Sequence, residues 1–507
     1  MKPLFRIITL LVFGLVHFSA KSHVSLPAII GSDMVLQQGI KLPIWGWACP
    51  GEKIEVSIAK DNLTTTADAK GKWKVVLNPL QAGHERLSMI IKGSHTTITL
   101  TNILVGEVWL LSGQSNMEWP LSLSKNSEYE VLRAYNQDIR LFQVKNTDLE
   151  NEATDTEGNW AICDAMAASS FSAVGYYFGK ELYEKLDVPI GLINSTWGGT
   201  PAEAWVRKSV LEKDTYYDEK LAVYDSILTT YNGYNNAINA WWDWIEKKIQ
   251  WNKEKRPKPK APPMPYSEAN NPWNISGMYN GMIAPLAPFA IKGVIWYQGE
   301  SNAKEALKYK ELFPNLIKDW RDVWAQGDFP FYYVQIAPLR APFYGEKEAA
   351  MIREAQLETL EKVKNTGMVV TTDLGNLMDI HPRNKRDVGK RLCLWALSQN
   401  YGRDVVYSGP LYKDMTIVKD EIILSFDHVG GGLVARDSAL TFFFIAGKDK
   451  QFYPGTAKIR GQQVIVSNKN IKRPVAVRFA FSNDAIPNFY NKEGLPASPF
   501  RTDDWEL

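Results

Sequence analysis

The stretch GEVWLLSGQSNMEW, residues 106–119, decides how the chain is interpreted. It begins as an apolar run rich in strand-forming residues and ends abruptly in a polar loop that contains one serine, Ser115. An apolar run without alternation is typical of a strand buried on both faces. A lone serine at such a junction is ordinarily a turn or capping residue. The role of Ser115 therefore depends on what the rest of the chain places beside it.

Similar apolar runs recur up to about residue 400 and alternate with amphipathic helical patterns. The strand-like segments include VPIGLIN, IKGVIWYQ, FYYVQIA and GMVVTTD, and the helical ones include YYFGKELYEKL and REAQLETLEKVK. This alternation predicts an α/β domain with a parallel sheet covered by helices on both faces. One insertion, at about residues 210–262, has helical spacing and then becomes rich in proline and lysine, which indicates a solvated loop.

The segments on either side of this α/β region are rich in short strand patterns separated by turn residues. We therefore expect an N-terminal β-sandwich-like domain at 23–105, the α/β domain at 106–402 and a C-terminal β-rich domain at 403–507. A chain of 507 residues is long enough for several such cores.

Residues 1–22 are typical of an export signal peptide. Lys2 and Arg6 precede the apolar run ITLLVFGLVHF, which is short for a bilayer span, and Ala20 and Ser22 are spaced for cleavage after Ser22. We expect a chain exported to the periplasm or outside the cell, with no membrane span in its mature form. A membrane anchor at the N-terminus is the alternative interpretation.

Charge and cysteine content narrow the classes of function. The net charge of +2 argues against a nucleic-acid partner. Cys49, Cys163 and Cys393 are far apart and form no CxxC pair, so neither a zinc site nor a disulfide framework is indicated, although an exported chain could form one bridge. We expect no metal and no cofactor, and the sequence leaves the oligomeric state open.

Four predicted strands end in polar groups, and ligands of an open α/β sheet bind beyond these carboxyl ends. The groups form the set that acyl transfer needs: a serine nucleophile, a histidine base, an acid that orients it, and donors for an oxyanion. Among the six histidines, only one follows an α/β strand end, and Asp427–His428 is a weaker rival pair. The residues in chain order are Ser115, Gly198, Gly199, Gln298, Glu300, Asn302, Asp379 and His381.

Four ordered motifs carry a resemblance to a known family. GQSNM, WGGTPAEAW, WYQGESN and DIHPRNK are similar to those of the SGNH hydrolases, and specifically of the sialate O-acetylesterase group of carbohydrate esterases. The similarity extends over nearly all of the mature chain. It implies a flavodoxin-like hydrolase domain that removes O-acetyl groups from sugars without a metal.

The resemblance implies roles for individual residues. Ser115 is the nucleophile and contributes its backbone N–H to the oxyanion hole, with Gly198, rather than Gly199, and the Gln298 amide as further donors. His381 is the base, and Glu300 and Asn302 order their loop. The wider superfamily usually places the acid three residues before the histidine, where this chain has Met378. We therefore assign the acid to Asp379, with Asp373 or a backbone carbonyl as alternatives.

The expected partner is an O-acetylated sugar or glycan, and its identity is the main open point. A sialic acid ester calls for a cation against the sugar carboxylate, for which Arg383 and Arg501 are candidates. A plant polysaccharide such as acetylated xylan calls for aromatic platforms. Trp119, Trp205 or the tryptophans at 241, 242 and 244 are candidates, although helical spacing favours packing for the last three.

Three other functions fit the sequence less well. A non-catalytic sugar-binding protein needs no nucleophile and base. A zinc deacetylase needs clustered ligands, and the α/β region has one histidine. A glycosidase needs two carboxylates, for which Glu203 and Glu300 are candidates, but it leaves Ser115 and His381 unexplained.

Overall fold

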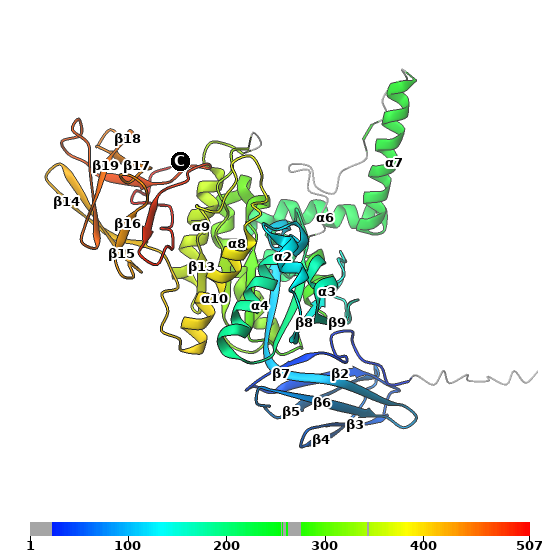
Figure 1. The fold of residues 1–507 in the computed structure, drawn as a ribbon. Coiled ribbons are helices and arrows are strands. Elements are labelled where there is room, and N and C mark those ends of the chain that lie inside the picture. The colour runs from blue at the N-terminus through cyan, green and yellow to red at the C-terminus, as the bar shows by residue number, and fades with distance from the viewer. Residues whose placement is uncertain (1–22, 255, 257–259, 262–274, 342–343, 507) are drawn as a thin grey trace, which may run out of the picture.

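The computed structural model describes residues 23–254, 256, 260–261, 275–341 and 344–506. The predicted signal peptide, residues 1–22, and most of the proline- and lysine-rich segment of the insertion lie outside the described residues. The described chain forms a central α/β domain with β-rich regions at both ends (Figure 1). The predicted fold class is confirmed. None of its described helices is long and apolar enough to cross a membrane.

The N-terminal β-domain is built from strands with one face buried. Its third and fifth strands alternate strictly between buried and more exposed residues, as expected where one face of an antiparallel sheet meets water. The second strand pairs with the fifth, and the third pairs with the fourth and sixth. The strands are β1 (Val35–Gln37), β2 (Leu42–Trp47), β3 (Lys53–Ile58), β4 (Asp61–Thr66), β5 (Lys72–Leu77) and β6 (Gly83–Lys92).

Strand β7 (Thr97–Gly113) belongs to both the N-terminal and the central domain. Its first half pairs antiparallel with β6, and its second half pairs parallel with two strands of the central sheet. Burial changes along it, because every residue from 103 to 113 is buried while the earlier part alternates. The predicted boundary between residues 105 and 106 therefore falls inside one continuous strand, visible in Figure 1 as the ribbon that joins the two domains.

The central sheet has the order β13-β12-β11-β7-β10-β8-β9. All neighbouring pairs are parallel except the edge pair of β8 with β9. Without β8 and β9, which extend one edge, the sheet has the flavodoxin-like order 2-1-3-4-5 with β7 as the first strand. The strands are β8 (Asn136–Gln143), β9 (Trp160–Cys163), β10 (Ile190–Thr196), β11 (Gly293–Tyr297), β12 (Phe331–Val334) and β13 (Thr366–Val369).

Successive side chains of each strand point to opposite faces of this sheet. Because the side chains on both faces are buried, helices cover both faces. Leu111 packs in the cluster that includes α4 (Ala173–Leu186) and α10 (Lys385–Tyr401). Leu110, its neighbour, packs in the cluster on the other side, with α8 (Ala306–Trp324) and α9 (Glu348–Lys362).

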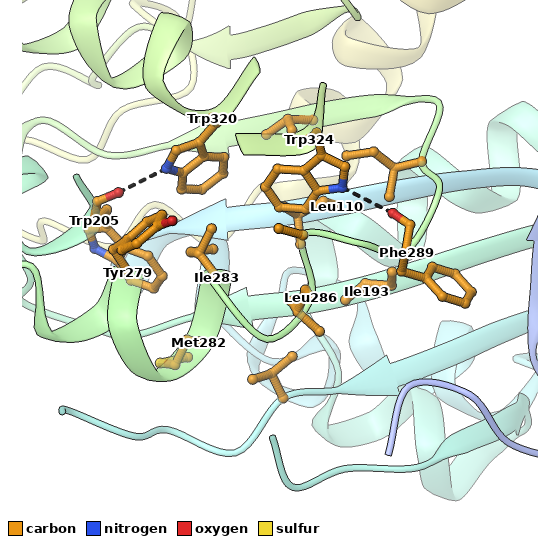
Figure 2. Packing of buried hydrophobic residues seen from close by; sticks show 14 of the residues in the cluster. Leu110, Ile193, Trp205, Tyr279, Met282, Ile283, Leu286, Phe289, Trp320 and Trp324 are labelled. Carbon is orange, nitrogen blue, oxygen red and sulfur yellow. Dashed lines mark hydrogen bonds between the residues drawn. The ribbon is translucent and has the colours of Figure 1, made fainter. Parts of the chain in front are cut away.

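Aromatic side chains fill the face that is covered by α8 (Figure 2). The indole N–H of Trp320 donates to the carbonyl of Trp205 at 2.8 Å, and that of Trp324 donates to the carbonyl of Phe289 at 3.0 Å. Trp205 has 0% of its surface exposed. The structure thus contradicts the prediction that Trp205 is a sugar platform, because its ring is enclosed in the core.

The insertion folds as two long helices, α6 (Asp218–Tyr231) and α7 (Tyr234–Lys253). Helix α7 extends away from the rest of the molecule (Figure 1). Trp242 on this helix is 54% exposed and meets Trp241 edge to face, with ring centroids 5.4 Å apart. Helical spacing favoured packing for this cluster, which is wrong for Trp242, whereas Trp241 and Trp244 are half-buried.

Short helical segments lie in the loops between these elements. They are α1 (Ser115–Glu118), η1 (Leu121–Leu123), α2 (Ser127–Leu132), α3 (Ala165–Ser170), η2 (Ala202–Trp205), α5 (Lys208–Leu211), η3 (Thr215–Tyr217), η4 (Tyr279–Ile283) and η5 (Glu300–Glu305).

The C-terminal region forms a separate β-rich core with its own cluster of buried aromatic and aliphatic residues. Two four-stranded sheets and one strand pair make up this region. The strands are β14 (Leu411–Val418), β15 (Glu421–Asp427), β16 (Leu433–Ala435), β17 (Phe443–Ala446), β18 (Phe452–Pro454), β19 (Thr456–Arg460), β20 (Gln463–Ser467), β21 (Ala476–Phe479), β22 (Phe489–Asn491) and β23 (Phe500–Arg501).

Gly106 tests how tightly β7 is held where it passes between the domains. A Cβ at this position would lie 1.9 Å from the carbonyl oxygen of Pro189. We expect Gly106→Ala to lower the free energy of unfolding by about 1–3 kcal/mol, as overpacking of a buried site does, measured by chemical denaturation. Gly83→Ala is the matched control, since a Cβ there meets nothing within 4 Å. Equal stability of the two variants would contradict this.

Candidate active site

Ser115 lies where β7 ends, at the first residue of α1. The strand reaches this point through Gly113, whose φ is +130° and whose added Cβ would lie 2.3 Å from the carbonyl oxygen of Tyr297. Only glycine allows β7 to end so close to β11. Because β10 and β11 flank β7, Ser115 stands at the point where the strand order reverses, where ligands of such sheets bind. Its side chain is partly exposed.

The structure brings Ser115 and His381 into direct contact. The Nε2 atom of His381 lies 2.8 Å from the Ser115 Oγ, although 266 positions separate the two residues in the sequence. This is hydrogen-bonding distance, and it is the geometry in which an imidazole accepts a hydroxyl proton. The pair predicted from two distant strand ends can therefore act as nucleophile and base.

Asp379 contacts the backbone of His381 more closely than its ring. Its Oδ1 accepts a hydrogen bond from the His381 backbone N–H at 2.9 Å and lies 3.9 Å from Nδ1. The second distance is too long for a hydrogen bond. The alternative acid, Asp373, is held by two hydrogen bonds from Arg391, at 2.6 and 2.7 Å. The role of Asp379 as the orienting acid stays a prediction.

Trp119 packs against the face of the His381 imidazole. Its ring stacks on His381 with centroids 4.9 Å apart and an interplanar angle of 23°. Stacking of this kind fixes the plane of a ring that lacks a short hydrogen bond at Nδ1. One face of Trp119 therefore lies against His381. The predicted role of Trp119 as a sugar platform stays a prediction.

Burial and nearby charge tune His381. Burial lowers the pKa of its imidazole below 6.5, the charge of Lys385 lowers it further, and Asp379 opposes both. The neutral form, which accepts a proton, is therefore favoured at neutral pH. The rival His428 lies in the C-terminal region against Tyr407 and Trp395, with ring centroids 5.1 and 6.3 Å away.

The predicted oxyanion donors lie around Ser115, but two of them already have partners. The Ser115 N–H is in the first turn of α1, where helix N–H groups have no partner within the helix. Gly198 lies against Ser115, since a Cβ on it would be 3.2 Å from the serine Cβ. Its N–H donates to the Glu118 carboxylate at 2.6 Å. A substrate oxyanion would have to displace that carboxylate.

Gln298, the first residue after β11, is fully buried. Its amide nitrogen donates to the carbonyl of Thr200 at 3.3 Å and to the Oδ1 of Asn302 at 2.7 Å. Asn302 in turn donates to Glu203 at 2.7 Å. The loop is thus ordered by a buried polar network, and donation from Gln298 to an oxyanion stays a prediction.

A cavity of about 870 Å³ is lined by residues on both sides of His381 in the sequence. Two cations, Lys125 and Arg383, face it together with amide and hydroxyl groups, and the backbone N–H of Lys125 donates to the carbonyl of Arg383 at 2.8 Å. Neither cation has a carboxylate within ion-pair distance among the residues that the structure describes. Arg501, the other candidate cation, is held by Glu354 and Asp503. The remaining lining residues are Ser124, Asn126, Ser127, Glu128, Tyr129, Leu374, Gly375, Asn376, Leu377, Pro382 and Asn384.

Comparison with known proteins indicates an esterase, which agrees with the contact between Ser115 and His381. A family model described as carbohydrate esterase, sialic acid-specific acetylesterase, matches residues 105–238 and 265–396, which is more than half of the chain. This chain belongs to that family of carbohydrate esterases. The predicted family is confirmed, and the protein is a carboxylic ester hydrolase.

Relatives match along almost the whole esterase. A carbohydrate acetylesterase from Xanthomonas citri is 36% identical, and its crystal structure aligns with a TM-score of 0.82 over 95% of this chain and 100% of that one. Sialate O-acetylesterase of Mus musculus is 29% identical over 98% of this chain and 97% of its own. The Homo sapiens protein of the same name is 28% identical over 93% of this chain and 91% of its own.

Sequence reasoning missed three polar residues of the esterase site: Asn116, Glu118 and Lys385. Each lies within or beside a quoted motif, yet helix-forming or polar residues at such places are usually solvated. Lys385 is only 1% exposed, and its Nζ donates to the Oδ1 of Asn116 at 2.5 Å. A lysine four residues after the predicted base was the available signal. Within the described residues, no cluster of three or more His, Cys, Asp or Glu could hold a metal ion.

The charge of Asp379 can be tested apart from its contact with the backbone. Asparagine keeps the Oδ1 that accepts the His381 N–H but removes the charge that raises the pKa of His381. The base must be neutral to act, so activity falls as pH drops through this pKa. We expect Asp379→Asn to move the acid limb of the kcat/KM profile for p-nitrophenyl acetate to lower pH.

Asp379→Ala is the companion variant, because it removes both the charge and the acceptor. We expect it to lose more activity than Asp379→Asn at every pH. An acid limb that stays in place or moves upward in Asp379→Asn would contradict the electrostatic role.

Proposed function

We propose that this esterase removes O-acetyl groups from sialic acids through an acetyl-enzyme on Ser115. The observation that carries the mechanism is the 2.8 Å contact between the Ser115 Oγ and the His381 Nε2. The support for the substrate is the family description and the names of the mammalian relatives. Acetyl xylan or another acetylated plant polysaccharide is the alternative substrate.

The reaction has two steps on the same pair of residues. In the first, the Ser115 Oγ attacks the acetyl carbonyl while His381 takes the hydroxyl proton. The tetrahedral intermediate collapses as the sugar oxygen leaves with the proton from His381. In the second, a water attacks the acetyl-enzyme, His381 takes its proton, and acetate leaves as the proton returns to Ser115. His381 is neutral at the start of each step, which agrees with its lowered pKa.

Stabilisation of the oxyanion requires a local rearrangement at Glu118. The Gly198 N–H is close enough to Ser115 to serve the developing charge, but it donates to Glu118 before substrate binds. A carboxylate and an oxyanion cannot share one donor at short distance, because like charges repel. We infer that the incoming acetyl group takes the place of the Glu118 oxygen.

The cavity beside His381 supports an anionic sugar. Arg383 lies two residues from the base, so their Cα atoms are at most about 7.6 Å apart, and a sugar bound at Ser115 is within reach of a guanidinium there. Arg383 and Lys125 are both free of carboxylate partners in the described part of the chain and line the same hollow. A carboxylate on the sugar would satisfy them, whereas a neutral xylan would not.

The nucleophile and the base are tested by Ser115→Ala and His381→Ala. Loss of either a triad-type nucleophile or its base typically lowers kcat by several orders of magnitude. We expect each variant to fall at least about 1,000-fold in release of p-nitrophenol from the acetate ester. Thermal melting of each variant checks that it folds. A folded variant with near wild-type kcat would refute the mechanism.

Arg383→Ala tests the class of sugar. Because the lost contact is to a carboxylate, we expect kcat/KM for O-acetylated sialic acid to fall about 10-fold or more. The rates on p-nitrophenyl acetate and acetylated xylo-oligosaccharides should stay unchanged. Arg386→Ala is the matched control, since Arg386 is exposed on the same segment and does not line the cavity. A wild-type enzyme that deacetylates only the neutral sugars would refute the sialate assignment.

A further inference from the structure

Asn116, the residue after the nucleophile, is completely buried and has three hydrogen-bond partners. Its Oδ1 accepts from the Nζ of Lys385 at 2.5 Å, and its Nδ2 donates to the Oε1 of Glu300 at 2.8 Å and to the carbonyl of Ile380 at 3.0 Å. We refer to Asn116, Lys385 and Glu300 together as the Asn116 clamp. None of the three is explained by the acyl-transfer steps.

The partners leave the amide only one orientation. In their charged forms an ammonium group only donates and a carboxylate only accepts, so Lys385 then requires the amide oxygen and Glu300 the amide nitrogen. A rotation of the amide by 180° would place two donors together on one side and two acceptors together on the other. Both charged partners are themselves buried, at 1% exposure for Lys385 and 9% for Glu300.

Burial makes this arrangement sensitive to the loss of any member. Burial raises the pKa of Glu300 and lowers the pKa of Lys385 to about 7. The hydrogen bond from Asn116 and the positive charge of Lys385 partly counter the rise in the pKa of Glu300. Hydrogen bonds to charged groups are the stronger kind, and a buried partner left without one is costly. Loss of any one of the three residues therefore leaves a buried polar group without its partner.

The clamp connects three separate loops of the active site. Asn116 follows Ser115 on α1, Glu300 begins η5 after β11, and Lys385 begins α10 beyond the base. Ile380, whose carbonyl binds the amide, directly precedes His381. Fixing Asn116 to that carbonyl fixes the backbone on which Ser115 stands relative to the backbone on which His381 stands.

We propose that Asn116, oriented by Lys385 and Glu300, is a positioning residue that holds the Ser115 hydroxyl in line with the His381 ring. The proposal rests on the proposed serine mechanism. Lys385 also reaches the other half of the pair, because its Nζ lies 5.8 Å from the centre of the Trp119 ring that stacks on His381. Displacement of a reacting group by about 1 Å lowers rates by up to about 100-fold.

The test is Asn116→Ala with p-nitrophenyl acetate as substrate. The clamp residues lie behind the reacting pair, so kcat is expected to fall 10- to 100-fold with KM within twofold of wild type. The rate of Ser115 phosphonylation by a p-nitrophenyl phosphonate should fall in parallel, because that reaction needs the same alignment. Retention of kcat and of the phosphonylation rate within twofold would overturn the proposal.

Asn491→Ala provides a matched control for loss of a buried amide. Asn491 lies in the C-terminal region, is 1% exposed, and donates to the carbonyls of Ser408 and His428 at 3.0 and 3.4 Å. It is expected to lower the melting temperature without changing kcat. A loss of kcat equal to that of Asn116→Ala would show a general stability effect and overturn the proposal.

A pair of changes at Glu300 keeps the test decisive if Asn116→Ala does not fold. Glu300→Gln retains an acceptor for the Asn116 amide and is expected to lose about threefold in kcat, whereas Glu300→Met removes the acceptor and should lose at least tenfold. Equal losses would overturn the proposal. Ser115→Ala in the same assay separates the serine mechanism from the role of the Asn116 clamp. Activity in Ser115→Ala would refute Ser115 as the nucleophile. An inactive Ser115→Ala together with fully active clamp variants would refute only the role of the clamp.

Discussion

The close approach of β7 and β11 at Gly113 is the constraint on which the site depends. With no side chain at this position, β7 reaches its last residue beside the Tyr297 carbonyl and turns at once into α1. The next loops along the sheet, after β10 and β11, then surround Ser115. A bulkier residue would push the turn away from β11 and separate the nucleophile from the groups that the neighbouring strands supply.

The same strand also joins the catalytic domain to the N-terminal β-domain. The first half of β7 is an antiparallel partner of β6, and its second half is the central strand of the parallel sheet. In the first half of β7, where buried and more exposed residues alternate, a shift by one residue would reverse the burial of the side chains. The register of the strand that leads to Ser115 is therefore set by its pairing in both domains.

The sequence predicted the fold class and the residues at the strand ends because these depend on local patterns. Continuous burial marks parallel strands, and polar residues that follow them in order converge at one edge. Partners chosen by tertiary geometry were harder to foresee. Trp205 is enclosed in the core, whereas Trp242 is 54% exposed. Whether a helix packs against the domain or projects from it is not encoded in its own spacing, and the same holds for Lys385, whose burial depends on Asn116 and Glu300.

The orientation of His381 shows how such a site works without a short carboxylate contact at Nδ1. In the triad arrangement, one acid fixes the tautomer and the plane of the ring. Here the plane is held by Trp119, the backbone by Asp379 and the preceding carbonyl by Asn116. These contacts act on different parts of one residue, so the ring is already placed at 2.8 Å from the serine before substrate arrives. Asp379, two residues before the histidine instead of three, lies 3.9 Å from Nδ1, and its charge raises the pKa of His381 through space. A stacked ring, a loop carboxylate and a clamped amide thus together place His381, where the triad arrangement uses one acid.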